Sequence, residues 1–388
     1  MSCNEDETVP DDAVRIGLLL PFTGEDAAIG TNYEHAVLMV EDEINRNGGI
    51  GGHPVAFIAK DTHSSADRAW QAILELQQEG VVAIIGPEST EIARTILPRL
   101  QQSGIPLISP VISGGESIFL DEGYKWFRLS PSASIIGRTF ANRLWDDGVT
   151  ELSLVYSNDD YNLDFIGALA VRFTSRGGLI SSRVYLADGA LSYADKVAQL
   201  KQGGTSDVVI SASVEGAARF VNDLTSTYSS TPWDWYLSPL LETPVFPQNT
   251  FPGAVEGAQG VGIEVSGYDE TFRDMYVSRW KTEPLDGAFF YYDAAALLTL
   301  SLEQVAVSGA PFSQESTQVA VDDVAYRGGI QVKWNQLNAG LSQVRAGQAI
   351  SYSGLSGPIL FDEVGEQQKA PLKYWSIVDG EVVDDVVE

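Results

Sequence analysis

The fold is decided by residues 14–20, which read Val-Arg-Ile-Gly-Leu-Leu-Leu. A run of seven residues that is almost wholly apolar is typical of a strand buried on both faces of a parallel sheet. Apolar residues then recur near helical spacing from Tyr33 to Ile44, and Gly48 can end a helix in the left-handed conformation. Residues 14–49 therefore predict the strand and the helix that open an α/β domain.

The same alternation continues along the chain. It predicts strands at residues 54–59, 81–85, 105–109, 152–156, 179–186 and 208–210, and helices at 66–78, 90–102, 161–175, 193–202 and 216–224. Strands that alternate with helices of about 10–15 residues form right-handed βαβ units, whose parallel sheets are covered on both sides. The predicted fold class is therefore α/β, in two lobes. Residues 127–132 and 257–268 are predicted as crossovers rather than core elements.

The composition excludes one large class of functions. The 388 residues carry 24 Lys and Arg against 53 Asp and Glu, a net charge of 24 − 53 = −29. Nucleic-acid affinity needs clustered basic side chains, so no nucleic-acid partner is expected. Strong acidity favours a soluble monomer. The length fits two domains of ordinary size.

The only cysteine of the chain, Cys3, lies in the acidic stretch Met-Ser-Cys-Asn-Glu-Asp-Glu at residues 1–7. A lone cysteine cannot form an internal disulfide, and residues 1–12 are predicted to be a flexible tether. Cys3 resembles the lipid-modified first residue of a mature bacterial lipoprotein whose signal peptide has been removed. The alternative is an incidental cysteine in the tail of a cytosolic protein.

The side chains needed for most enzyme chemistry are scarce. His35, His53 and His63 are the only histidines, and none stands at a metal-ligand spacing. The single thiol lies in the tail, so a cysteine–histidine pair is not expected. We therefore expect a protein that is not an enzyme and that needs no metal and no cofactor.

Several motifs together resemble one known family. They are residues 16–24 (Ile-Gly-Leu-Leu-Leu-Pro-Phe-Thr-Gly), 85–89 (Ile-Gly-Pro-Glu-Ser), 105–110 (Ile-Pro-Leu-Ile-Ser-Pro) and 354–362 (Gly-Leu-Ser-Gly-Pro-Ile-Leu-Phe-Asp). In this order they resemble the type I periplasmic binding proteins of the leucine/isoleucine/valine-binding family, the substrate receptors of ABC importers. The resemblance implies two Rossmann-like lobes with parallel sheets, joined by three hinge crossovers, with the ligand in the cleft between them. It places 13–130 and 262–355 in the N-terminal lobe, and 131–261 and 356–388 in the C-terminal lobe.

The carboxylate of a ligand has a predicted site at the start of the helix that follows residue 85. Unpaired N–H groups and the positive end of the helix dipole lie there, at the carboxyl edge of a parallel sheet, and Ser89 and Thr90 add hydroxyls. The alternative is that Ser89 or Thr90 only caps the helix. The resemblance implies further donors from a second loop that contains Ile112 and Ser113.

The ligand's ammonium needs an acidic partner, and the sequence leaves several open. Glu242 lies about two residues from the family's ammonium-binding carboxylate, and Leu240 occupies the matching place. Asp160, Glu215 and Asp293 are the other candidates, although Asp293 could instead anchor a helix. Tyr161 matches a family position that contacts ligand from the second lobe, but it could also be a solvated loop tyrosine.

We therefore expect an extracytoplasmic, lipid-anchored receptor that passes an amino acid or related small carboxylate to the membrane permease subunits of an ABC importer. Ile29 and Ser213 stand where the family often has aromatic residues, so the wall of the pocket differs and branched aliphatic ligands cannot be assumed. The alternative is a ligand-sensing receptor or regulator domain of the same fold for a small amide or aromatic acid.

Overall fold

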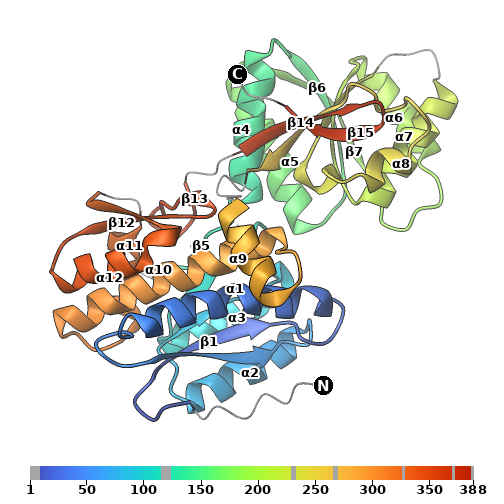
Figure 1. Ribbon diagram of the computed structural model, residues 1–388. Coiled ribbons are helices and arrows are strands. Elements are labelled where there is room, and N and C mark those ends of the chain that lie inside the picture. Colours follow the sequence, from blue (N-terminus) through green and yellow to red (C-terminus); the bar gives the residue numbers. More distant parts are fainter. Residues whose placement is uncertain are drawn as a thin grey trace. The chain divides into compact units, whose positions relative to one another are not determined.

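The computed structural model describes residues 9–114, 124–228, 233–264, 270–325, 328–368 and 372–385. They form two compact units (Figure 1). Unit 1 takes its described residues from Met1–Ser113, Ser117–Pro131 and Val265–Lys369, and unit 2 takes most of its own from Ser132–Glu264 and Ala370–Glu388. Gly114 is also grouped with unit 2, and the long segments of the chain pass between the units after residues 131, 264 and 369.

Unit 1 is built on a parallel sheet whose strand order is β2-β1-β3-β4-β5. Its strands and helices, in chain order, are β1 (Val14–Leu20), α1 (Ala27–Arg46), β2 (Val55–Asp61), α2 (Ala66–Gln78), β3 (Ala83–Ile85), α3 (Thr90–Leu100), β4 (Leu107–Ser109), β5 (Phe127–Arg128), α9 (Glu270–Trp280), α10 (Asp286–Ser308), α11 (Gln314–Val324), β11 (Ile330–Lys333), α12 (Leu337–Arg345), β12 (Ile350–Gly354) and β13 (Gly357–Pro358). Strands β11, β12 and β13 form a separate small sheet.

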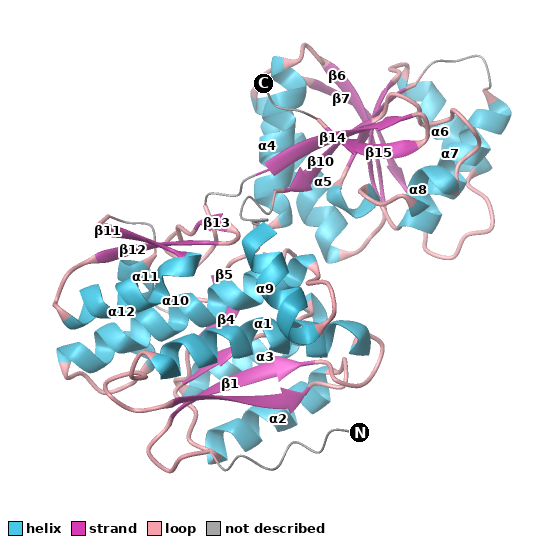
Figure 2. Ribbon diagram, in the orientation of Figure 1, coloured by secondary structure: helices cyan, strands magenta, loops and turns pink. Residues whose placement is uncertain are grey.

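Helices cover both faces of the unit 1 sheet (Figure 2). Helices α1 and α10 pack against each other on one side, and α2 packs against α3 and the strands on the other. The apolar faces of α2 and α3 meet Leu19, Ile84 and Leu107 of the sheet in one buried cluster. Burial on both faces explains why the strand at residues 14–20 is apolar throughout.

Unit 2 contains a seven-stranded sheet in the order β15-β14-β10-β9-β8-β6-β7. Its elements are α4 (Ala133–Asp146), β6 (Glu151–Tyr156), α5 (Asp160–Ser175), β7 (Leu179–Tyr185), α6 (Ala194–Gly203), β8 (Asp207–Ser211), α7 (Val214–Thr227), β9 (Asp234–Leu237), α8 (Val245–Gln248), β10 (Gln259–Ile263), β14 (Leu372–Val378) and β15 (Glu381–Asp384). Strands β6 to β10 pair in parallel, whereas β14 and β15 are antiparallel to their neighbours.

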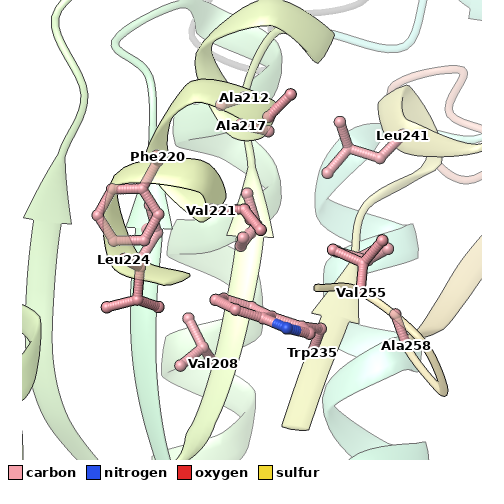
Figure 3. Packing of buried hydrophobic residues seen from close by; sticks show 14 of the residues in the cluster. Val208, Ala212, Ala217, Phe220, Val221, Leu224, Trp235, Leu241, Val255 and Ala258 are labelled. Carbon is pink, nitrogen blue, oxygen red and sulfur yellow. The ribbon is translucent and has the colours of Figure 1, made fainter. Parts of the chain in front are cut away.

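The core on one face of this sheet is formed by side chains from α7 and the strands beneath it (Figure 3). Phe220, Val221 and Leu224 of α7 lie over Val208 of β8 and Trp235 of β9, and all of them are buried. The helix positions 217, 220, 221 and 224 repeat at three and four residues, which gives α7 one continuous apolar face.

The structure confirms the α/β class and corrects several boundaries. Residues 127–128 and 259–263, which the sequence predicted as crossovers, are strands β5 and β10. The third passage of the chain lies after residue 369 rather than 355, because the segment between them packs on unit 1. Glu366 forms an ion pair with Arg128, and the Phe361 ring packs edge-on against Phe127 at 4.9 Å.

Asp293 holds this C-terminal segment of unit 1 in place. Its side chain is fully buried in α10, and its two oxygens accept hydrogen bonds from Tyr352 Oη (2.9 Å), Leu355 N (2.8 Å), Ser356 N (2.7 Å) and Ser356 Oγ (2.6 Å). Burial raises the pKa of the carboxyl to about 6, although these four donors oppose the shift. Gly354 is required beside it, since a Cβ there would lie 2.2 Å from the carboxyl carbon.

None of the helices within the described residues has the length and apolar character needed to cross a membrane.

Asp293→Asn should destabilise unit 1 by about 2–3 kcal/mol at pH 7.5, because the amide turns an NH₂ group toward backbone and hydroxyl donors that a carboxylate accepts. The measurement is urea denaturation followed by fluorescence. Asp274→Asn is the matched control, since that side chain is 77 % exposed and should change stability by less than about 0.5 kcal/mol. Equal unfolding midpoints for D293N and wild type would contradict the anchoring role.

Candidate functional site

The candidate site in unit 1 lies where β3 ends and α3 begins, at the carboxyl edge of the parallel sheet. Residues 86–89 link the two elements. Gly86 has φ +117°, and a Cβ at this position would lie 2.6 Å from the carbonyl oxygen of Leu19. Only glycine fits this approach to β1, and it lets the chain turn directly into the helix.

Ser89 and Thr90 present hydroxyls that other parts of the described chain do not use. Ser89 is the N-cap residue of α3, but its side chain makes no capping hydrogen bond. The N-cap side chains Ser132, Asp159 and Ser213 do make such bonds at α4, α5 and α7. Two hydroxyls and the unpaired N–H groups of an 11-residue helix can therefore receive an anionic group at this point.

The second predicted loop follows the neighbouring strand β4 at the same edge. The Ile112 side chain is 1 % exposed and belongs to the core between the sheet and helices α2 and α3, so only its backbone could meet a ligand. The Ser113 hydroxyl is half-buried and hydrogen bonds to the Ser130 hydroxyl at 2.9 Å. Because β3 and β4 are adjacent, the structure brings the Ser89 and Ser113 loops to one sheet edge.

In unit 2, Tyr161 lies in the first turn of α5, directly after β6 ends. Its ring is half-buried and stacks on Phe165 with centroids 6.5 Å apart. Burial, assisted by the charge of Asp159, raises the pKa of its hydroxyl well above the ordinary range. Tyr161 thus stays neutral at physiological pH and can act as a hydrogen-bond donor.

A polar network supports this edge of unit 2. Asn162 Nδ2 donates to Ser157 Oγ at 2.9 Å, and Ser211 Oγ donates to Asn162 Oδ1 at 2.5 Å. The hydroxyl of Ser157 in turn donates to Asp159 Oδ2 at 2.9 Å. These bonds link the ends of β6 and β8 to the start of α5 and so fix the backbone that carries Tyr161.

The acidic candidates for an ammonium partner in unit 2 have other partners. Glu242 Oε1 lies 2.6 Å from Lys373 Nζ, and the Glu242 side chain is 20 % exposed. Glu215 Oε1 lies 2.5 Å from Arg219 Nη2 on the surface of α7. Asp293, in unit 1, is the buried anchor described above, and we leave it out of the candidate site.

Glu88 belongs to the motif at residues 85–89, but the sequence alone assigns it no role. Its Oε1 accepts a hydrogen bond from Thr62 Oγ1 at 2.8 Å, whereas its buried Oε2 has no hydrogen-bond partner among the described residues. Burial raises the pKa of this carboxyl, and the charges of Asp26 and Asp61 raise it further. The sequence feature that could have drawn attention to Glu88 is its position between the strand that ends at Ile85 and the helix that begins at Thr90.

Cys3, the predicted lipid-bearing residue, lies outside the described residues.

Three comparisons with known proteins bear on this geometry. The chain is 28 % identical over 97 residues to the Leu/Ile/Val-binding protein BraC3 of Rhizobium johnstonii. The aligned stretch covers 25 % of this chain and 26 % of BraC3. The chain is 22 % identical over 371 residues to BasB of Halobacterium salinarum, a chemotactic signal transduction system substrate-binding protein, covering 89 % of this chain and 83 % of BasB. The chain thus spans about a quarter of the length of BraC3 but most of BasB.

The fold has close counterparts among solved structures. One, from Rhodospirillum rubrum, carries the name branched-chain amino acid ABC transporter and superposes with a TM-score of 0.73 at 22 % identity, over 96 % of this chain and all of that one. The family model described as "Periplasmic binding protein" matches residues 13–349. Since this match covers most of the chain, including both units, the protein belongs to the periplasmic binding protein family.

Proposed function

We propose that this protein is an extracytoplasmic solute-binding protein of an ABC importer, and that it binds an amino acid or a related small carboxylate between its two units. The observation that carries this proposal is the pair of unused hydroxyls, Ser89 and Thr90, at the positive end of α3 in a chain of this family. A carboxylate placed there would accept charge-assisted hydrogen bonds from hydroxyl and N–H donors.

Binding of this kind couples ligand affinity to the conformation of the protein. Unit 1 supplies Ser89, Thr90 and Ser113, and unit 2 supplies Tyr161. A ligand that contacts both units binds more tightly when they close on it, so it shifts the protein toward a closed state. The permease subunits of the importer would then recognise the closed state, and the ligand would be passed on without chemical change.

Thr90→Val tests the carboxylate site. Replacing the hydroxyl by a methyl removes one hydrogen bond to a charged group, which should weaken binding by about tenfold or more. The measurement is calorimetry after a thermal-shift screen of the twenty amino acids and small carboxylates, in which a ligand at 100 times its Kd should stabilise the protein by about 2.7 kcal/mol.

Thr95→Val is the control for that experiment, because Thr95 lies on the same helix and hydrogen bonds to its own backbone at Glu91 O. It should bind every hit as the wild type does. Equal weakening of binding in both variants would show a general effect on α3 rather than a ligand contact. Chemical conversion of a bound molecule by the protein would exclude the receptor function.

A sensory function is the second candidate, and one observation favours it: BasB, a component of a chemotactic system, is similar over 89 % of this chain. The same binding event could be read by a membrane signal transducer instead of a permease. The two functions make different predictions for a strain that lacks this chain.

A deletion strain should lose uptake of the radiolabelled ligand, and the wild-type chain should restore it, if the importer function is right. Unchanged uptake combined with lost movement toward the ligand would support the sensory function instead. A T90V chain should fail to restore whichever response is lost, because both depend on the same binding step.

We also propose that Cys3 carries a lipid that holds the protein at the periplasmic or outer face of the cytoplasmic membrane. A single lipid chain with an acidic tether gives reversible binding, so multiple acylation is expected. In a strain that processes lipoproteins, Cys3→Ser should move the protein from the membrane to the soluble fraction, with ligand affinity unchanged. Equal membrane fractions for both forms would exclude the anchor.

A further inference from the structure

Glu88 is a half-buried acid with one of its two carboxylate oxygens buried and without a hydrogen-bond donor. Thr62, whose side chain is fully buried, donates to Oε1 at 2.8 Å. Oε2 is buried but accepts no hydrogen bond from any described residue. A buried carboxylate oxygen without a donor is costly, so a further partner, such as a water molecule or a donor group of a ligand, has to satisfy it.

A second buried polar group of unit 1 also lacks a partner. Tyr291 of α10 is fully buried, and its hydroxyl has no hydrogen-bond partner within the described residues. The charge of Glu88 contributes to the raised pKa of this hydroxyl, which places the two groups within electrostatic reach of each other. Tyr33 stacks on Tyr291 with centroids 4.7 Å apart and an interplanar angle of 21°. Two polar atoms of unit 1, Glu88 Oε2 and Tyr291 Oη, thus have no hydrogen-bond partner within the described residues.

The electrostatic surroundings of this place are negative. Asp26 and Asp61 act on Glu88, and Asp26, Asp286 and Glu88 together with burial raise the pKa of Tyr33 to about 12. A purely anionic ligand would be repelled here, whereas a positive group would be attracted.

We propose that Glu88 receives the positively charged amine of the ligand, so that the site selects amines and zwitterions over simple carboxylates. This inference rests on the proposed binding function and adds the residue that sets the class of ligand. Glu88 immediately precedes Ser89 and Thr90, so one loop would hold both ends of a zwitterion: the carboxylate on the hydroxyls and helix N–H groups, and the amine on Glu88.

The acid predicted for this role from sequence, Glu242, is less suited to it. Its carboxylate already faces Lys373 at 2.6 Å, and Lys373 also pairs with Asp384 at 3.0 Å. A ligand amine would have to displace a resident cation. At Glu88 it would meet an oxygen that has no donor.

The test compares Glu88→Gln with wild type, using calorimetry on each amino acid that binds and on the same molecule without its amino group, for example L-leucine and 4-methylpentanoate. E88Q should lower the affinity for the amino acid by at least about tenfold, because an amine–carboxylate pair is lost. It should leave the deaminated analogue unchanged or tighter. Its melting temperature without ligand should stay the same or rise, because an incompletely paired buried charge is removed.

Two further variants make the result specific. Glu91→Gln removes the same charge from an exposed position in the first turn of α3, and it should bind as the wild type does. Glu242→Gln tests the rival acid directly. A tenfold loss in E242Q with none in E88Q would overturn the inference and return the amine to unit 2.

The remaining outcomes separate this inference from the proposed function. If amino acids bind wild type and E88Q equally, the function stands and the role of Glu88 falls. If the wild type binds a small carboxylate but no amino acid or amine, the function again stands and the inference falls. If it binds none of these molecules, both fall. Should E88Q fail to fold, E242Q decides, since the inference requires this variant to keep the wild-type preference for the amino acid over its deaminated analogue, and loss of that preference would overturn the inference.

Discussion

The parallel pairing of β1 with β2 and β3 determines where every candidate ligand group in unit 1 lies. Leu18 is paired with Ala59 on one side and Ile85 on the other, so the three strands end at nearly the same level. Asp61, at the end of β2, and the loop with Glu88 and Ser89 after β3 are more than 20 residues apart in sequence but lie at one edge of the sheet. That register places the Asp61 carboxylate near the loop in which a ligand is expected to bind.

Much of this arrangement could be predicted from the sequence, because it depends on local patterns. The strand at 14–20 and the helix at 66–78 have the bounds predicted from apolar periodicity and capping residues alone. Residues 127–128 and 259–263 were predicted as crossovers because Pro, Gly and small polar residues surround them. They are strands because neighbouring strands supply partners, and such long-range pairing leaves no local pattern.

For the candidate site in unit 1, the sequence predicts which loop is involved, residues 86–89, but not how its side chains are arranged. The sequence predicts that a helix begins at residue 90, and α3 begins there, which brings Ser89 and Thr90 to the sheet edge. No pattern in the sequence shows whether their hydroxyls cap the helix or stay unused, because that depends on atoms a few ångströms apart. The ion pair between Glu242 and Lys373 joins residues more than a hundred positions apart, and it was invisible for the same reason.

Asp293 and the proposed role of Glu88 illustrate how the same chemical group can serve stability or binding. Both are acids in unit 1 whose pKa is raised by burial. Asp293 accepts four hydrogen bonds from the segment it anchors, which offset the cost of its burial. Glu88 accepts one from another side chain and keeps a buried oxygen without a donor. The Thr62 hydrogen bond satisfies one oxygen of Glu88, and the other oxygen keeps the cost of burial without a donor. A residue that serves binding can lower the stability of the free protein, because its missing hydrogen-bond donor is then supplied by the ligand.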